Sequence, residues 1–398
     1  MTTTTTLPEH TAPEPIDLDR PDLDREAALT AWVDEIGRAV SPHTARHDAD
    51  GTFVTEAFDI LRSSGYLALG VPVELGGRGA TIREVALANR VLARHCASTA
   101  LASSMHNHVV LFTAWRHRRG LPGAEATLRR VAEEGIILVS TGGADLTRPR
   151  GQAVPTDGGY LVSGRKIFAS QSPVGTVMST MFALDDPEDG PLVLNMSVPL
   201  GADGVEVLDT WDALGMRGTG SNEIDLTDVF VPEDRVLARR PVGVIDPPLQ
   251  IIMTIAISTV TSVYLGVAEG ARDAALEAVR GTSKADDPLV QRQVGLMQSR
   301  LQVAAWALDG VLTLAGDDPT PSLETALAVM AAKREVALAG IEVCDIAMDL
   351  AGGGAFFKGS PIERAYRDIR AVKFHPLQLE ESLQRTGQLA LGLPADLR

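Results

Sequence analysis

The sequence predicts an α+β fold with three consecutive parts: an N-terminal helical domain, a middle β-domain and a C-terminal helical bundle. Apolar residues recur at three- and four-residue steps towards both ends of the chain, the pattern of amphipathic helices. Between about residues 136 and 241 the period shortens, and runs rich in Val, Ile and Phe alternate with Gly, Pro and Asp turns. The changes of period predict domains at residues 23–135, 136–241 and 242–398.

The first domain contains "DREAALTAWVDEIGRAV", which follows an Asp cap, and a long apolar helix pair that ends in "SMHNHVVLFTAW". In the second domain, strands such as "GGYLVSGRKIFAS" and "NEIDLTDVFVP" have the spacing of an antiparallel barrel or sandwich. The third domain has helical stretches of about 20 to 30 residues that are apolar over much of their circumference, which is typical of a four-helix bundle that packs on another subunit.

Composition excludes several classes of partner. The 398-residue chain is 45% hydrophobic and carries a formal net charge of −16. Such acidity disfavours nucleic acid and anionic membranes as partners, because binding to both depends on neutralising phosphates with Lys and Arg. Binding of a small anionic ligand remains compatible with this charge, since a few suitably placed arginines can hold a pyrophosphate. Cys96 and Cys344 lie in apolar helical stretches and are predicted to be buried free thiols.

The N-terminal 22 residues, rich in Thr and Pro, are predicted to form a disordered leader. They contain no apolar segment of the kind found in secretory signals. The most apolar run further along, Ile251–Ala268, includes several Thr and Ser residues and is predicted to be a buried core helix. We therefore expect a cytoplasmic protein without a membrane partner.

One segment points to a family. "TWDALGMRGTGSNEIDLTDVFVPEDRVL" (Thr210–Leu237) closely resembles the end of the β-domain in the acyl-CoA dehydrogenase superfamily. Four further stretches agree in order and spacing, among them "GGYLVSGRKIFAS" and "LAGGGAFFKGSPIERAYRDIRA", so that the likeness covers nearly everything from about residue 25 onward. The resemblance implies a homodimeric or homotetrameric flavoprotein whose flavin lies between the β-domain and the C-terminal bundle.

The resemblance also assigns flavin contacts. Phe168 matches an aromatic residue beside the isoalloxazine ring, and Ser170 matches a hydroxyl that bonds near flavin N5; alternation along a strand would place both on one face. Ser140 and Thr141 begin the segment that corresponds to a flavin-lining loop. That segment, "STGGADLTRPRG", is shorter here and lacks the family's E-P-x-A-G-S-D pattern, which weakens the inference of CoA binding.

A second set of contacts concerns the dinucleotide part of the cofactor. Arg280, with Thr282 beside it, falls where the family places an arginine on the FAD pyrophosphate, a task that suits a bidentate and permanently charged donor. Gly352 and Gly353 match a backbone approach to the neighbouring subunit's dinucleotide, although Asp349 replaces the usual Gln nearby. The expected cofactor is FAD, or FMN, which a partner flavin reductase could supply in reduced form.

The chain departs from the dehydrogenases at the catalytic base. Removal of an acyl-CoA α-proton needs a carboxylate, which the family supplies from one of two positions. Those positions correspond here to Pro376 and Ala256, and neither residue is an acid. His375, beside Pro376, and Ser170 instead resemble the flavin-flanking pair of the superfamily's oxygen-using branch, the two-component flavin monooxygenases and sugar nitrososynthases.

Three functions follow from this comparison. The favoured one is a reduced-flavin monooxygenase that hydroxylates N, S or C of a small molecule through a C4a-hydroperoxyflavin, with Ser170 on N5–H and His375, at an ordinary pKa of about 6.5, deprotonating or orienting the substrate. The second is an acyl-CoA dehydrogenase with Glu380 or Glu381 as a displaced base, in the first turn of a final helix opened by Pro376. The third is a non-catalytic flavin-binding or scaffold homologue.

The helix pair contributes the candidate substrate pocket. Met105, His106 and His108 lie in a stretch that faces the substrate in family members. Two residues apart on a helix, the two histidines cannot both face one ligand, so no metal site is expected there. The expected partners are therefore a small-molecule substrate and a flavin reductase or another electron-transfer protein.

Overall fold

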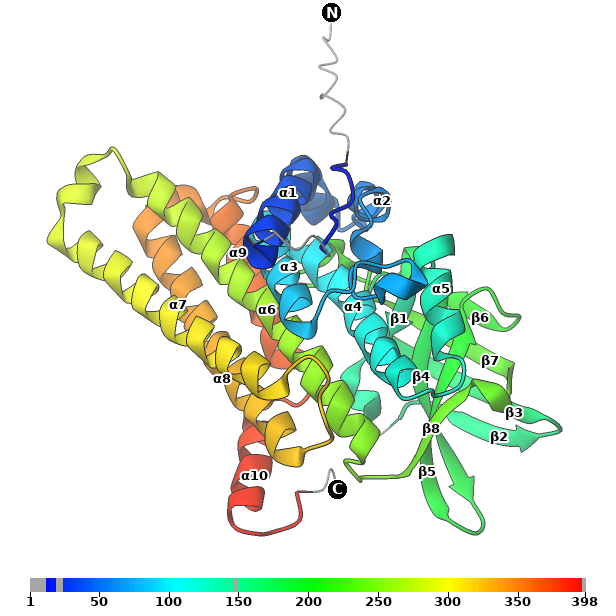
Figure 1. Cartoon of the computed structure of the whole chain (residues 1–398). Helices are drawn as coiled ribbons and strands as arrows, with labels where there is room; N and C mark the ends of the chain where they lie inside the picture. Colours follow the sequence, from blue (N-terminus) through cyan, green and yellow to red (C-terminus); the bar gives the residue numbers. More distant parts are fainter. Residues whose placement is uncertain (1–11, 19–23, 147–148, 396–398) are drawn as a thin grey trace, which may run out of the picture.

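The structure, a computed structural model, describes residues 12–18, 24–146 and 149–395. Its N-terminal part is helical, its middle part is a sheet and its C-terminal part is again helical, which confirms the predicted α+β architecture (Figure 1). The N-terminal helices are α1 (Arg25–Asp50), α2 (Thr55–Ser63), α3 (Ile82–His95), α4 (Ala97–Arg118) and α5 (Ala124–Glu134).

The middle part is a single eight-stranded sheet in the order β6-β7-β3-β2-β4-β5-β8, with β1 paired to β4. Most neighbours are antiparallel as predicted, but β1 and β2 both pair with β4 in parallel, so the sheet is mixed. The chain passes through β2 and β3 between β1 and β4, which gives the long connection that a parallel pair requires. The strands are β1 (Leu138–Ser140), β2 (Gln152–Thr156), β3 (Gly159–Ala169), β4 (Val177–Asp186), β5 (Gly190–Pro199), β6 (Val205–Val207), β7 (Asn222–Pro232) and β8 (Val236–Pro241).

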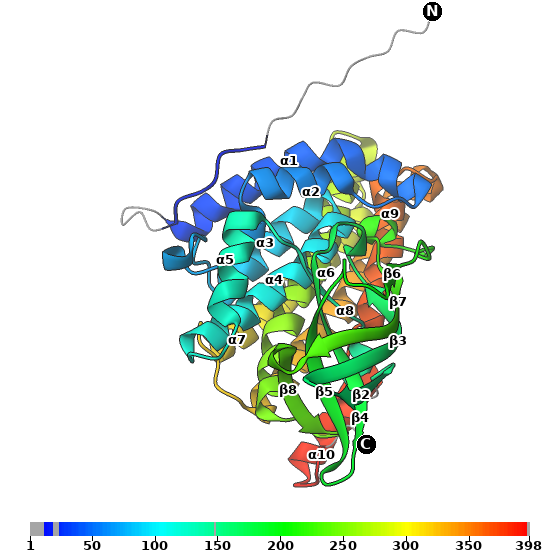
Figure 2. The same ribbon diagram turned by 90° about the vertical axis from the view of Figure 1, so that its right-hand side faces the viewer.

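The C-terminal part consists of long helices that pack on one another and on the N-terminal helices. Residues of α3 and α4 contact α6, so both helical parts share one continuous apolar core, whereas the sheet has its own core around Phe182 and Leu194. Figure 2 shows the sheet against one side of this helical body. The elements are α6 (Pro247–Val279), α7 (Pro288–Ala315), α8 (Leu323–Ala351), α9 (Pro361–Asp368), the 3₁₀ segment η9 (Ile369–Phe374) and α10 (Leu379–Ala390).

Side-chain caps explain where several helices begin. Asp24 accepts a hydrogen bond from the Ala27 amide at the start of α1, and Thr81 and Glu84 form a reciprocal capping box at the start of α3. At the start of α6, the Asp246 side chain accepts a hydrogen bond from the Leu249 amide. Among the described helices, α6 is long and apolar enough to cross a membrane, but 89% of its most apolar window is buried inside the protein, the arrangement of a core helix.

The predicted leader is partly structured. Residues 1–11 and 19–22 lie outside the described residues, but residues 12–18 pack on α1 and its neighbours: Leu18 is 2% exposed, and the Glu14 carbonyl accepts a hydrogen bond from Trp32 Nε1 at 2.8 Å. The physical reason is an apolar pair, Ile16 and Leu18, that joins the helical core. Cys96 and Cys344 are buried and unpaired, as expected.

Candidate active site

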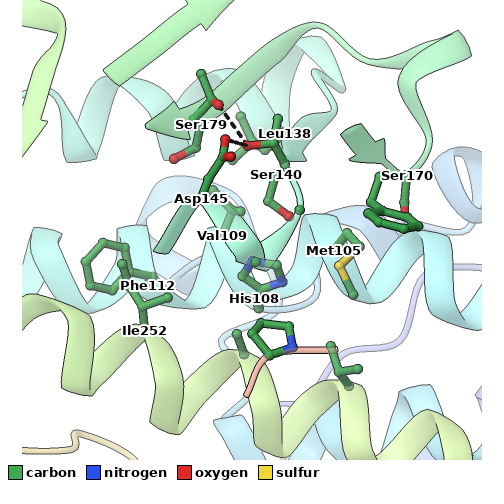
Figure 3. Close-up of a pocket in the computed structure, with 18 of the residues that line it drawn as sticks. Met105, His108, Val109, Phe112, Leu138, Ser140, Asp145, Ser170, Ser179 and Ile252 are labelled. Carbon is green, nitrogen blue, oxygen red and sulfur yellow. Dashed lines mark hydrogen bonds between the residues drawn. The ribbon is translucent and has the colours of Figure 1, made fainter. Parts of the chain in front are cut away.

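A cavity of about 730 Å³ lies between the sheet and the helical body. Its walls come from α4, β1, β4, β5, the start of α6 and two loops, one around Trp211–Met216 and one at residues 375–377, which we call the His375 loop. Figure 3 shows Met105 and His108 of α4 together with Ser140 of β1 and Ser170, the residue that follows β3, around this space. The cavity therefore forms where the three parts of the chain meet.

An aromatic and hydroxyl-rich wall closes one end of the cavity. Phe168 is 51% exposed, and its ring meets the edge of Trp211 with centroids 6.0 Å apart. Beside them, the Ser170 hydroxyl lies 2.8 Å from the Ser221 hydroxyl, which lies 2.7 Å from that of Thr219. All five side chains line the cavity.

Strand alternation is not what brings Phe168 and Ser170 together. β3 ends at Ala169, its pairing with β7 shifts register between Lys166 and Ala169, and Phe168 has a φ of 54°. A left-handed conformation is unfavourable for an aromatic residue and is typical of functional sites. The irregular end of the strand therefore turns both side chains into the cavity.

This wall fits a flavin. A flavin needs a flat partner against its ring and hydrogen-bonding groups at its polar edge. Phe168 supplies exposed aromatic surface beside the partly exposed Trp211, and the Ser170 hydroxyl oxygen next to it is a hydrogen-bonding group. Because Thr219 donates to the Met216 carbonyl, Ser221 donates to Thr219 and Ser170 donates to Ser221. Ser140 also lines the cavity; beside it, the Thr141 hydroxyl lies 2.8 Å from that of Thr180, another residue of the cavity wall.

The His375 loop carries the imidazole expected to act on the substrate. His375 lines the cavity, and its Nε2 lies 2.6 Å from the hydroxyl of Tyr264 on α6. Lys333 on α8 donates hydrogen bonds to the His375 carbonyl at 2.5 Å and to the Leu377 carbonyl at 2.8 Å. The side chain and the backbone of His375 are thus held by two different helices.

His375 is a weaker base than expected. Burial, with the nearby charge of Lys333, lowers the pKa of His375 to about 3. The imidazole is therefore neutral at pH 7 and accepts or donates hydrogen bonds, and the expectation of a base with an ordinary pKa near 6.5 does not hold. Burial also lowers the pKa of Lys333 to about 7.

The two histidines of α4 have different roles. His108 lines the cavity, and its Nδ1 donates to the Ser104 carbonyl at 3.1 Å, which leaves Nε2 as an acceptor. His106 does not line the cavity: its Nε2 donates to the Leu67 carbonyl and its Nδ1 accepts from the Leu138 amide. His106 therefore joins α4 to β1 and to the Leu67 segment and, against the prediction, does not line the cavity, whereas Met105 and His108 do line it. Burial lowers the pKa of both histidines to about 4.

Both positions at which the dehydrogenases carry their base lie at the cavity and hold no acid. Ala256 and Pro376 line it, whereas Glu380 and Glu381 do not. Pro376 lies three residues before α10, so it does not open that helix, although the two glutamates are in its first turn as expected. The structure therefore gives no support to a displaced carboxylate base.

The carboxylates that do line the cavity are engaged or exposed. Asp145 forms an ion pair with buried Lys166 at 3.0 Å, and Asp212 pairs with Arg217 at the rim. Asp234 is exposed. Among the described residues no group of three His, Cys, Asp or Glu is placed to hold a metal ion.

The residues expected at the cofactor pyrophosphate do not join this cavity. Arg280 ends α6 and is exposed, and the Thr282 hydroxyl donates to the Val279 carbonyl at 2.7 Å. Gly352 and Gly353 begin the turn after α8. None of these four residues lines the cavity of the single chain.

Sequence reasoning missed three groups that support the cavity. Tyr264 and Lys333 hold His375, and buried Asp368 accepts a hydrogen bond from the Met216 amide at 2.5 Å, which fixes the Trp211–Met216 loop. Burial raises the pKa of Asp368 to about 6. A signal existed for Lys333, which stands alone among apolar residues on the buried face of α8, three residues after Met330 and four before Ala337.

Models of the acyl-CoA dehydrogenase N-terminal, middle and C-terminal domains match residues 24–139, 140–229 and 258–378 in that order. L-evernosamine nitrososynthase of a Micromonospora species is 32% identical over 381 residues, which cover 90% of this chain and 88% of the relative. A putative acyl-CoA dehydrogenase of Bacillus subtilis, YdbM, is 29% identical over 87% of this chain and 92% of its own. Other relatives are an isobutylamine N-hydroxylase and flavin-dependent monooxygenases.

The solved structure of KijD3 in complex with FMN and dTDP-3-amino-2,3,6-trideoxy-4-keto-3-methyl-D-glucose superposes with a TM-score of 0.83 at 30% identity, covering 95% of this chain and 96% of that one. FMN and the amino-sugar nucleotide are the ligands of KijD3 in that structure. The agreement in fold extends over almost the whole chain.

Proposed function

This chain belongs to the acyl-CoA dehydrogenase superfamily, and on that basis we propose that it oxidises the nitrogen of a primary amine on a small molecule with reduced flavin and O₂. The expected family and the expected flavin cofactor are confirmed, and the relatives identify the protein as a reduced-flavin monooxygenase. The amine substrate, FMN as the flavin and a separate reductase are the finer parts of the proposal.

One observation carries the proposal: both base positions face the cavity without a carboxylate, while two neutral imidazoles, His108 and His375, take part in its wall. A carboxylate would stabilise a bound amine as ammonium, whose nitrogen has no lone pair to attack oxygen. Neutral imidazoles and apolar walls favour the free base instead, because burial penalises the charged form of an amine.

The chain's own groups would then act in order. Phe168 and Trp211 would hold the flavin ring, with the Ser170 hydroxyl at its polar edge. The Nε2 lone pair of His108 would accept an amine N–H and leave the nitrogen lone pair free. His375, held by Tyr264 and Lys333, would orient the same amine.

The reaction balances as an insertion of one oxygen atom. A bound reduced flavin would supply two electrons. One oxygen atom of O₂ then enters the new N–O bond, and the other is released as water. The amine loses one N–H proton and gains a hydroxyl group, which gives a hydroxylamine. Return of the flavin to its reduced form needs a reductase that draws on a nicotinamide dinucleotide.

The proposal is tested by supplying the full-length protein with FMN, a nicotinamide-dependent flavin reductase and O₂ in the presence of a panel of primary amines. The expected result is an amine-dependent product heavier by one oxygen atom, with catalase present to remove free peroxide. Omission of the protein is the control. Products from none of the amines, together with bleaching of the bound flavin by acyl-CoAs under argon, would overturn the proposal in favour of the dehydrogenase.

We further propose a homodimer or homotetramer. Large apolar side chains of α7 are exposed in the single chain: Leu289 is 72% exposed and Trp306 is 65% exposed. Such surface on long bundle helices favours contact with another copy. Light scattering on the purified protein tests this, and a monomeric mass at micromolar concentration would contradict it.

A further inference from the structure

The cavity-facing stripe of α4 continues beyond the amine end of the site. Met105, His108, Val109, Phe112 and Arg116 follow one another at three- and four-residue steps and all line the cavity. Figure 3 shows Phe112 and Ile252 on one side of His108 and Ser170 on the other. The cavity therefore extends from the hydroxyl-rich wall, past His108, along an apolar stretch towards Arg116.

Arg116 is unusual among the arginines of this stripe and its surroundings. It is partly buried, and it donates to the Pro122 carbonyl at 3.2 Å. No described carboxylate pairs with it, whereas Arg130, Arg367 and Arg370, which also line the cavity, all form ion pairs. Arg235, the other described arginine of the lining without an ion pair, is exposed to solvent, whereas Arg116 is partly buried. Burial lowers the pKa of Arg116, and no acidic group opposes that shift.

A partly buried cation without an acid in a wall of mixed polarity is costly unless a ligand compensates it. The overall charge of the protein is −16, so carboxylates are abundant elsewhere on the chain. Guanidinium groups bind carboxylates and phosphates through two parallel hydrogen bonds. The free donors of Arg116 thus have the chemistry of an anion receptor at the end of the cavity opposite Ser170.

We propose that Arg116 binds an anionic group of the substrate, a carboxylate or a phosphate, while the substrate's amine lies at His108 and His375. Eight residues of helix separate His108 from Arg116, which corresponds to about 12 Å along the axis. The substrate class is therefore an elongated molecule with an amine at one end, an anion at the other and an apolar or weakly polar middle that passes Val109 and Phe112. The position of the amine rests on the proposed function, whereas the anion subsite does not.

Binding of matched probes tests the subsite without turnover. Isothermal titration of the full-length, FMN-loaded protein compares octylamine with 8-aminooctanoate and 8-aminooctyl phosphate, and 3-aminopropanoate serves as an anion too short to span the cavity. We expect the two long anionic probes to bind at least about tenfold more tightly than octylamine, as a charge-assisted interaction should allow. The phosphate-to-carboxylate ratio then identifies which anion the subsite prefers.

Variants assign the effect to Arg116. Arg116→Gln should abolish the preference for the anionic probes and leave octylamine binding unchanged, and Arg116→Lys should keep part of it. Arg118→Gln is the matched control, because Arg118 lies on the same helix, is exposed and pairs with Asp318 outside the cavity. FMN and riboflavin titrations exclude the flavin phosphate as the partner: Arg116→Gln should not weaken FMN relative to riboflavin.

Three results would each overturn the inference: equal or undetectable binding of the long probes to the wild-type protein, a preference for anions that survives Arg116→Gln, or a loss confined to FMN. A protein that binds the anionic probes through Arg116 but oxidises no amine would retain the anion subsite and remove only the proposed chemistry.

Discussion

The ammonium of Lys333 lies 2.5 Å from the carbonyl oxygen of His375, and the same ammonium binds the Leu377 carbonyl at 2.8 Å. One buried side chain of α8 thus holds the backbone on both sides of Pro376. This contact fixes the loop that brings an imidazole to the cavity, and it makes Lys333 a positioning residue.

Lys333→Met should lower the turnover number for amine oxidation by about tenfold or more, because two buried carbonyls lose their donor and the His375 loop loosens. The free energy of unfolding should fall by about 1–3 kcal/mol. Steady-state kinetics and denaturant unfolding measure the two effects. Lys373→Met removes an exposed charge from the same segment and should change neither; a Lys333→Met enzyme with unchanged turnover would refute the positioning role.

His375→Ala should separate oxygen consumption from product formation. Without the imidazole the amine is poorly oriented, so product formation should fall by about a hundredfold while reduced flavin still reacts with O₂ and releases hydrogen peroxide. Tyr264→Phe, which removes only the hydroxyl bound to His375 Nε2, should give a smaller loss of the same kind. Full product formation by His375→Ala would remove His375 from the mechanism.

Ser170→Ala should increase the fraction of O₂ that ends as peroxide, because the hydroxyl next to the aromatic wall is removed from the polar edge of the flavin. The Ser221 hydroxyl also loses its 2.8 Å partner. Parallel assays of peroxide and product measure the ratio. Ser163→Ala is the control and should behave like the wild type, because Ser163 lies in β3, the strand before Ser170, and is bonded to Asp228 at the surface.

Glu380→Gln and Glu381→Gln should leave the turnover number unchanged within about twofold, since neither residue reaches the cavity. Under argon, acyl-CoAs of different chain length should not bleach the bound flavin, because no carboxylate stands at either base position. Rapid-scanning absorbance detects such bleaching. Loss of acyl-CoA-dependent bleaching in one of these variants would show that a displaced base exists.

The histidine contribution to stability should fall as the pH drops below about 6.5, whereas Lys333, whose pKa is lowered to about 7, makes stability fall already at higher pH. His106, His108 and His375 have folded-state pKa values of about 4, 4 and 3, below the ordinary value, so between these pH values the unfolded chain binds more protons. Each histidine contributes a slope of up to about 1.4 kcal/mol per pH unit. Asp368, whose pKa is raised to about 6, opposes this trend in part, because the folded state binds its proton first.

Thermal unfolding between pH 4.5 and 7.5 measures that slope. His106→Gln should remove the contribution of one histidine from the dependence of stability on pH. The substitution should also lower stability at pH 7, because the hydrogen bond from the Leu138 amide is weakened. A midpoint that does not change with pH across this range would contradict the lowered pKa values.

The fold could be predicted from the sequence because apolar residues recur with a different spacing in the helical parts and in the sheet. These signals are local: the length of the apolar run in "GGYLVSGRKIFAS" indicates a strand, and the long apolar stripes of α6 and α8 indicate helices. The structure has a strand and helices at these places. The parallel pairing of β1 with β4 could not be predicted, because β1 is only three residues long and its partner lies some forty residues further on.

The site was predictable only in part. Ser170 and His375 are found by resemblance, and helical spacing alone shows that His106 and His108 face opposite ways. The charge state of His375 depends on burial and on Lys333, a residue from another helix, so no local pattern reports it. Phe168 owes its direction to a break in the strand, which a period of two does not reveal.

Pro376 lies against the 3₁₀ turn that follows β1. A methyl group on Gly143 would lie 2.0 Å from Pro376 Cγ, so the sheet and the helical body touch there with no room for one more carbon atom. The proline occupies the base position and also acts as a spacer between the two halves of the molecule. This close approach limits how near the sheet and the helical body can come at the cavity, and a Gly143→Ala protein would have to separate them there, which would change the space for a flavin and for the proposed amine.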